Sequence, residues 1–322
     1  MSETPIKTPI KTEVSTAGSG SVVEVFMAFL KLGLTSFGGP VAHLGYFHKE
    51  LVEHRGWVSE SHFSQLLALC QFLPGPASSQ LGFALGLLRA GWLGAIAAFV
   101  AFTLPSALLL VFFAWLLPSI PEGNADAAIH GLKLLACAVV ADAVWVMAKK
   151  LCPDWYRRGL ALVATTVLVL IVSVWAQLLV VVAGAVAGMI FCRQTVSSMQ
   201  PIIQLPYGRR FGLVLLVLFL LCLGLAFVPA EFGLVAIART FYQAGAMVFG
   251  GGHVVLPLLE SSVVVSGWVS AENFLAGYGA AQVIPGPMFA FAGYLGASIP
   301  TAHASGLGAG WPCCLCFYPA YY

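Results

Sequence analysis

Two glycine-proline blocks interrupt apolar stretches of this chain: Ser36–Pro40 reads SFGGP and Leu73–Pro76 reads LPGP. A helix that restarts after such a break has first-turn N–H groups with no intrahelical partner and a partial positive charge. Glycine lets a ligand approach the backbone, and a proline in the first turn removes no donor that the helix uses. The blocks therefore predict an anion site built from backbone groups. Close packing of helices is the alternative use of the glycines.

The same blocks occur a second time, in the same order. The glycine block at 33–39 recurs 212 positions later, and the other blocks recur 211 positions later. The second set is Gly245-x3-Phe249-Gly250-Gly251, Gly267-Trp-Val-Ser270, Phe274 and Gln282-x2-Pro285-Gly286-Pro287. Four blocks at one spacing indicate an internal duplication.

The broken segments supply most of the candidate substrate-binding residues. They are Ser36, Gly38, Gly39, Pro40, Pro74, Gly75, Pro76, Gly250, Gly251, Gly252, Pro285, Gly286 and Pro287. Three basic residues join them: Lys31, Arg89 and Lys133. Lys133 lies within an apolar stretch, where an unpaired cation costs several kcal/mol, which favours a functional role. For Arg89 and Lys31 the simpler interpretation is a position at the membrane interface.

Three further residues are candidates for proton coupling: His43, His253 and Asp142. Histidine changes charge near neutral pH, and each of these histidines follows a glycine block. A helix-capping role for the histidines and an interfacial position for Asp142 remain open as alternatives. Glu50 and Glu53 lie in a polar segment, where we expect both to be solvated.

The composition requires lipid as the main solvent. Hydrophobic residues make up 60% of the chain and charged residues 9%, against about 25% charged in soluble domains. We expect an all-α polytopic membrane protein with interrupted or re-entrant helices at FGGP and PGP. The expected apolar segments are Val22–Phe37, Gly91–Leu117 with a kink at Pro105, Ala127–Ala148, Gly159–Cys192 folded back near Trp175–Gln177, Phe211–Val228 and Phe241–Leu259.

Basic residues predict the orientation. Lys and Arg mark segment 149–158 and the loop after residue 192 as cytoplasmic, whereas the loops around Glu122 and Glu231 have no cation. The N-terminus is then cytoplasmic. Five spans separate the two duplicated units, and an odd number inverts the second unit, as in many secondary transporters.

This pattern divides the chain into five parts. They are a disordered cytoplasmic tail (1–21), the first repeat (22–192), a basic loop with a linking helix (193–230), an incomplete inverted repeat (231–300) and an atypical tail (301–322). The second repeat lacks counterparts of the later helices of the first, so we expect a C-terminally shortened chain.

Other classes of protein find little support. Cys313, Cys314 and Cys316 cluster with only His303 near them, too few ligands for a tetrahedral metal site. The chain has no nucleotide-binding P-loop, no Rossmann glycine pattern and no haem-type histidine pair. A net charge of +2 without a basic run argues against nucleic acid. We expect a protein that is not an enzyme and has no cofactor; a homo-oligomer is compatible with the sequence.

The motifs resemble those of the chromate ion transporter family. They are FxKxGxxSFGGP at Phe29–Pro40, KELV…GWVSE at Lys49–Glu60, QFLPGP at Gln71–Pro76 and FGGGHVVLPLLE at Phe249–Glu260. The resemblance implies a long, two-unit member that exports chromate across the bacterial inner membrane and confers resistance. Transport of another oxyanion such as sulfate, and an inactive shortened member, are the alternatives.

Overall fold

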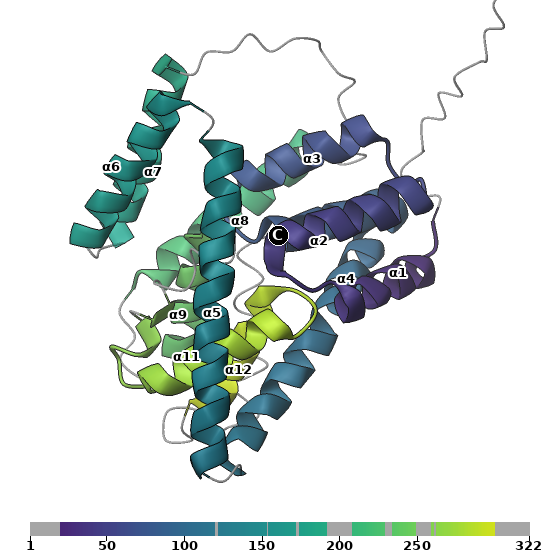
Figure 1. The fold of residues 1–322 in the computed structure, drawn as a ribbon. Helices are drawn as coiled ribbons and strands as arrows, with labels where there is room; N and C mark the ends of the chain where they lie inside the picture. Colours follow the sequence, from purple (N-terminus) through teal and green to yellow (C-terminus); the bar gives the residue numbers. More distant parts are fainter. Residues whose placement is uncertain are drawn as a thin grey trace, which may run out of the picture.

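In the computed structural model, the described residues are 20–119, 122–152, 154–171, 174–191, 208–228, 234–248, 259–260 and 262–299. Every regular element among them is a helix (Figure 1). In chain order they are α1 (Val22–Thr35), α2 (Gly39–Phe47), the π-helix η1 (His48–His54), α3 (Glu60–Phe72), α4 (Ala77–Leu116), the 3-10 turn η2 (Leu117–Ser119), α5 (Glu122–Leu151), α6 (Trp155–Leu170), α7 (Val174–Phe191), α8 (Arg209–Ala226), α9 (Leu234–Ala246), α11 (Ala271–Val283), the 3-10 turn η3 (Met288–Ala290) and α12 (Phe291–Ser298). The all-α prediction is confirmed for this part of the chain.

Helix α4 is the element that connects the parts of the fold. It packs against α1, α3, α11 and α12, so both duplicated units meet on it. Its backbone leaves the helical region at Ala90 and Gly91, where Gly91 has φ +66°. Gly86 and Gly94 flank this point, and a Cβ on Gly86 would stand 2.6 Å from the Gly94 carbonyl oxygen. The sharp break therefore lies at 90–91, whereas the sequence predicted a kink at Pro105.

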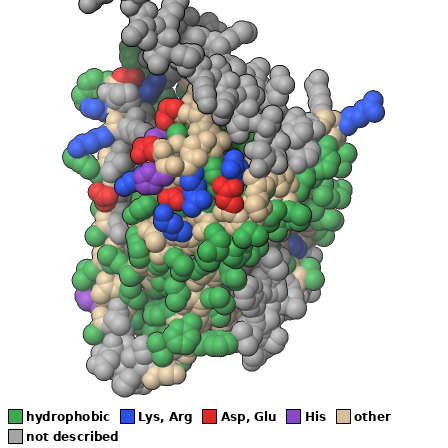
Figure 2. Space-filling view, turned by 90° about the vertical axis from the view of Figure 1, so that its right-hand side faces the viewer, with side chains coloured by type: hydrophobic (Ala, Val, Ile, Leu, Met, Phe, Trp, Pro, Cys, Tyr) green, Lys and Arg blue, Asp and Glu red, His purple; other side chains and the backbone are tan. Residues whose placement is uncertain are grey.

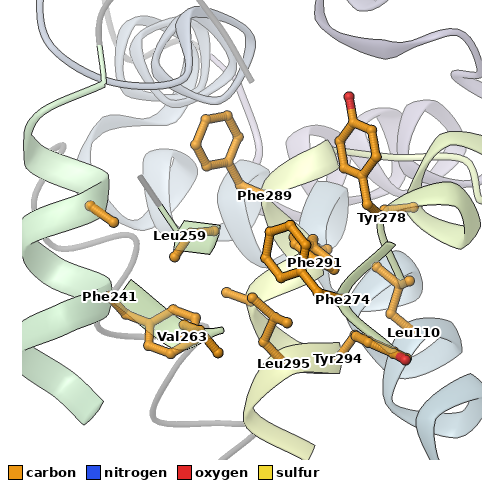
Figure 3. Packing of buried hydrophobic residues seen from close by; sticks show 14 of the residues in the cluster. Leu110, Phe241, Leu259, Val263, Phe274, Tyr278, Phe289, Phe291, Tyr294 and Leu295 are labelled. Carbon is orange, nitrogen blue, oxygen red and sulfur yellow. The ribbon is translucent and has the colours of Figure 1, made fainter. Parts of the chain in front are cut away.

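Two hydrophobic clusters make up the described core. One surrounds Phe29, Phe47 and Phe102 and joins α1, α2 and α4. The other surrounds Phe274 and Phe291, whose rings lie 5.3 Å apart, with Leu110 of α4 at its edge (Figure 3). Each cluster belongs mainly to one duplicated unit, and α4 contributes to both.

Helices α6 and α7 pack on each other and lie to one side of the other helices (Figure 1). Helix α6 ends at Leu170 and α7 begins at Val174, so the positions predicted to turn, Trp175–Gln177, lie within the first turn of α7. Helices α5 to α8 expose many large apolar side chains, among them Trp145, Leu162 and Leu220. Such surfaces are unfavourable in water and suit a lipid environment.

By length and composition, one helical stretch in the described residues can cross a membrane: Ala77–Ser119, 43 residues including η2. Shorter apolar helices are Leu179–Ile190, Arg210–Ala226 and Met288–Ser298. On the face drawn in Figure 2, acidic, basic and histidine side chains gather in one patch above a broad hydrophobic surface.

Candidate functional site

Two peptide hydrogen bonds join the broken segments to one another. The Gly75 N–H donates to the Val248 carbonyl at 2.6 Å, and the Gly286 N–H donates to the Ser36 carbonyl at 2.9 Å. In the sequence duplication, Gly75 corresponds to Gly286 and Ser36 to Val248. Each PGP turn is thus bonded to the residue two positions before the glycine pair of the other unit. We call these two contacts the crossing bonds.

The two PGP turns are formed by closely similar local sequences. Helices α3 and α11 begin at equivalent serines, Ser59 and Ser270, whose hydroxyls accept the N–H three residues later. Both helices end in an extended residue followed by the PGP turn. Its glycine has φ +129° at Gly75 and +104° at Gly286, a region that other residues rarely adopt. The glycine requirement at these positions therefore comes from the backbone.

The SFGGP break lies directly against the second PGP turn. Gly38 and Gly39 have φ +91° and +76°, and α2 starts at Gly39. A Cβ on Gly39 would stand 3.9 Å from Gln282 Oε1. On the other side, a Cβ on Gly286 would stand 2.8 Å from Ser106 Oγ and 3.1 Å from the Gly33 carbonyl oxygen. The structure therefore brings together Ser36, Gly38, Gly39 and Gly286 from the predicted site.

Helices that start at the breaks lack the side-chain caps found elsewhere. Ser21, Ser59, Asp154 and Ser270 each cap a helix with a side-chain oxygen. No side chain caps α2, α4 or η3, which follow Gly38, Pro76 and Pro287 respectively. Helix α8, which follows Gly208, also has no side-chain cap. Uncapped first turns retain N–H groups that an anion can accept from.

Several buried side chains near the breaks have polar atoms without a hydrogen-bond partner. A buried unpaired polar group costs about 1–3 kcal/mol, so such a group usually serves a function. The atoms are Ser36 Oγ, both ring nitrogens of His43, Ser79 Oγ, Gln80 Oε1 and Gln282 Oε1. We did not select Ser79, Gln80 and Gln282 from the sequence, although a polar residue beside PGP in an apolar stretch was the available signal.

The orientation of Gln282 follows from its neighbour. Its Nε2 lies 3.0 Å from Met288 Sδ, and a thioether sulfur accepts but cannot donate. Oε1 therefore faces the start of α2. Gln80 is similar, since its Nε2 donates to the Pro74 carbonyl at 2.7 Å and its Oε1 has no partner.

The sequence predicted that the glycines of the breaks offer free N–H donors, and this is not so for Gly75 and Gly286. Both N–H groups are occupied by the crossing bonds. The donors left for a ligand belong to the first helical turns after the breaks, beginning at Gly39, Ala77 and Met288. The glycines themselves position those turns.

Two basic candidates lie elsewhere, in an ionic cluster that extends along α1 and includes the end of the first limb of α4. Lys31 Nζ is 2.8 Å from Glu50 Oε2, and Arg55 Nε is 2.9 Å from Glu50 Oε1. Arg89 pairs with Glu24 at 3.2 Å. We define the ionic cluster as these ion pairs together with Trp57, the indole that they surround: Glu24, Lys31, Glu50, Arg55, Trp57 and Arg89.

Trp57 holds this cluster together. Its Nε1 donates to Glu24 at 3.0 Å, and the guanidinium groups of Arg55 and Arg89 lie 5.6 and 5.3 Å from its ring centre. The expectation that Glu50 is solvated is wrong, since only 8% of the residue is exposed. The hydrogen bond from Lys31, more than that from Arg55, lowers the pKa of Glu50 to about 2.

The remaining candidates fall in different places. His43 is buried beside Ser36 and the Phe102 ring. Lys133 is half-buried on α5, and its neighbour Leu132 packs on Gly279 of α11. Asp142, also on α5, is exposed. The second glycine block and the histidine that follows it, Gly250, Gly251, Gly252 and His253, lie outside the described residues.

One family of known proteins matches the chain twice, once in each duplicated unit. The family model described as "Chromate transporter" matches residues 23–189 and again 235–321. The chain belongs to the chromate transporter family. The two matches cover the two duplicated units, and family membership makes this a membrane transport protein.

Curated relatives agree along most of the chain. A "Probable chromate transport protein" of Synechococcus elongatus is 33% identical over 92% of this chain and 74% of its own length. A "Chromate transport protein" of Cupriavidus metallidurans is 30% identical over 97% of this chain and 77% of its own. The one from Pseudomonas aeruginosa is 29% identical over 86% and 66%. No solved structure matches the chain.

Proposed function

We propose that this protein is a secondary transporter that moves chromate, or a closely related tetrahedral oxyanion, out of the cytoplasm across the bacterial inner membrane. The observation that carries the proposal is the pair of crossing bonds, one of which sets the uncapped start of α2 in the first unit against the uncapped start of η3 in the second. The names of the relatives supply the substrate, chromate.

The two units are proposed to form an inverted repeat that opens alternately to the two faces. A rotation that exchanges the units exchanges one crossing bond for the other, as expected of paired repeats. The ionic cluster supports the orientation, because the equivalent positions of the second unit are neutral: Ala236, Gln243 and Ser266 stand where Glu24, Lys31 and Arg55 stand in the first. This cationic end is proposed to face the cytoplasm, together with the N-terminus.

Binding in this proposal relies on backbone dipoles. Lys31 and Arg89, the two basic candidates nearest the breaks in sequence, are held by Glu50 and Glu24. Helix N-termini supply partial positive charge and N–H donors without a full charge. A dianion held in this way meets no full positive charge that would retain it, and a carrier must release its substrate.

The membrane potential is sufficient as a driving force. Moving one elementary charge through 100 mV is worth about 2.3 kcal/mol, so a dianion leaving a negative cytoplasm gains about 4.6 kcal/mol. That free energy corresponds to a concentration ratio above about 10³. Export conferring resistance therefore needs no nucleotide hydrolysis.

Flux of radiolabelled chromate into everted membrane vesicles tests the proposal. Vesicles carrying the protein are expected to accumulate chromate when a potential, positive inside, is imposed, and vesicles from the empty host are not. Sulfate and molybdate added as competitors measure selectivity among oxyanions. Absence of chromate accumulation, with the protein present in the membrane, would refute the proposed function.

A further inference from the structure

His43 is the buried titratable group that the proposed binding site does not use. The residue is 1% exposed, and neither ring nitrogen has a hydrogen-bond partner. Its ring packs edge-to-face on Phe102 of α4 at 5.5 Å between ring centres. A polar side chain buried in this way is destabilising unless another state of the protein gives it a partner.

Among the described residues, the Ser36 backbone is the polar group that acts on the imidazole, although the pair does not meet the geometry of a hydrogen bond. No charged side chain among the described residues acts on His43. The nearest charged residues along the chain are Lys31 on α1 and Lys49 and Glu50 on η1; Lys31 is paired with Glu50, and Lys49 is exposed. A protonated His43 therefore has Ser36 as its natural acceptor within the protein.

The Ser36 carbonyl is also the acceptor of a crossing bond, that from the Gly286 N–H. The crossing bond can thus be opened from either end. An oxyanion at the start of α2 is a stronger acceptor than a peptide carbonyl and competes for the Gly286 N–H. An imidazolium at position 43 is a stronger donor than a peptide N–H, and a carbonyl oxygen that it shares with the Gly286 N–H holds that N–H more weakly.

We propose that His43 binds the proton that is exchanged for the oxyanion, and that proton and oxyanion open the Gly286–Ser36 crossing bond from opposite ends. A carrier with neither ligand keeps the bond closed and cannot rearrange. The loaded carrier moves outward, and the protonated carrier returns. A proton enters from the external side, resides on the imidazole during the return and leaves to the cytoplasm. This inference rests on the proposed function and adds a coupling residue to it.

A comparison of the two crossing bonds supports a special role for the one between Ser36 and Gly286. The other crossing bond ends at Val248, whose side chain has no hydroxyl, whereas Ser36 has a buried Oγ without a partner. Gln282 also faces the start of α2 beside this bond, and its counterpart in the first unit, Gln71, is exposed. The unpaired polar atoms of Ser36, His43 and Gln282 therefore lie around the Ser36–Gly286 bond, whereas those of Ser79 and Gln80 lie in the first turn of α4, beside the other crossing bond.

Everted vesicles in which the membrane potential is clamped at zero separate exchange from net transport. In vesicles preloaded with unlabelled chromate, we expect the His43→Gln variant to exchange labelled chromate at the wild-type rate. In empty vesicles with an acidic lumen, the pH gradient is expected to stimulate chromate uptake in the wild type, and His43→Gln is expected to lose that stimulation. The control is His130→Gln, an exposed histidine on α5, which should keep both activities.

Lumen pH, followed with a fluorescent dye, gives a second readout. Chromate entry should make the lumen more alkaline in the wild type and not in His43→Gln or His43→Asn. The inference is overturned if either variant keeps the stimulation by the gradient, or if both lose exchange although they are present in the membrane. A wild type without chromate exchange would refute the proposed function itself.

Discussion

At the crossing bonds the two units are joined by neutral peptide groups, whereas in the ionic cluster three elements of one unit are joined by charges. Gly75, Gly286 and their acceptors carry no side-chain charge, and the helices beside them start without caps. In the ionic cluster, Glu50 and Glu24 each accept from more than one partner. Charged side chains therefore make the contacts of the ionic cluster, which are to stay paired. Neutral peptide groups make the crossing bonds, where a ligand is to compete for the N–H.

Charge introduced at a crossing bond should have the largest effect. In Gly75→Asp, a carboxylate enters a buried turn with φ +129°, where an unpaired charge costs about 3–5 kcal/mol. We expect chromate accumulation in everted vesicles to fall to background. Gly208→Asp is the matched control, because an aspartate at the exposed start of α8 is a favourable cap. If Gly75→Asp transports normally, the crossing bonds are not part of the pathway.

Two glycine-to-alanine variants distinguish the effect of tight packing at the second PGP turn from the effect of backbone strain. In Gly286→Ala, the new Cβ meets Ser106 Oγ at 2.8 Å as well as a left-handed φ. In Gly267→Ala, φ is +70° and no atom lies within 4 Å. Strain alone costs roughly 1–2 kcal/mol and overpacking roughly 1–3 kcal/mol more.

The measurement is melting temperature in detergent together with chromate flux. We expect Gly286→Ala to melt lower than Gly267→Ala and to lose most of its flux, while Gly267→Ala keeps flux. Equal effects of the two variants would mean that contact between the units at Gly286 is unimportant.

Removing the central carboxylate of the ionic cluster should affect stability rather than substrate binding. Glu50→Gln leaves Lys31 and Arg55 without a charged partner. Since the Lys31 side chain is 57% exposed, we expect a loss of about 1–2 kcal/mol. Glu53→Gln, at a side chain that is 55% exposed, is the control and should change little. Chromate KM should stay the same in both; a raised KM in Glu50→Gln would assign the cluster to the substrate path.

The smallest expected effect is a dependence of stability on pH at His48. Its hydrogen bond with Glu60, more than any other contact, raises the pKa of His48 above 6.5. Stabilisation by the charged imidazole is therefore complete below pH 6.5 and is lost as the pH rises through the folded-state pKa. Glu50 behaves oppositely, since its lowered pKa gives stability above about pH 4.5 that is lost toward pH 2. Melting temperature between pH 6 and 9 should fall slightly in the wild type and not in His48→Gln.

Sequence patterns predicted the helical class and the position of both PGP turns, because helix breaks and their spacing are local properties of the chain. They could not reveal that Gly75 and Gly286 use their own N–H groups, since the acceptors Val248 and Ser36 are 173 and 250 positions away in the sequence. The burial of Glu50 was missed for the same reason, because Lys31 is on another element. Gln282 was overlooked because its orientation depends on Met288.

The most direct test concerns the inverted arrangement of the two units. Single cysteines at Glu53 and Val265, exposed residues that lie three and two positions before the two GWVS segments, can be labelled with an impermeant maleimide over the background of the native cysteines. The account predicts that Glu53→Cys reacts in everted vesicles and Val265→Cys in right-side-out vesicles. Reaction of both from the same side would contradict it.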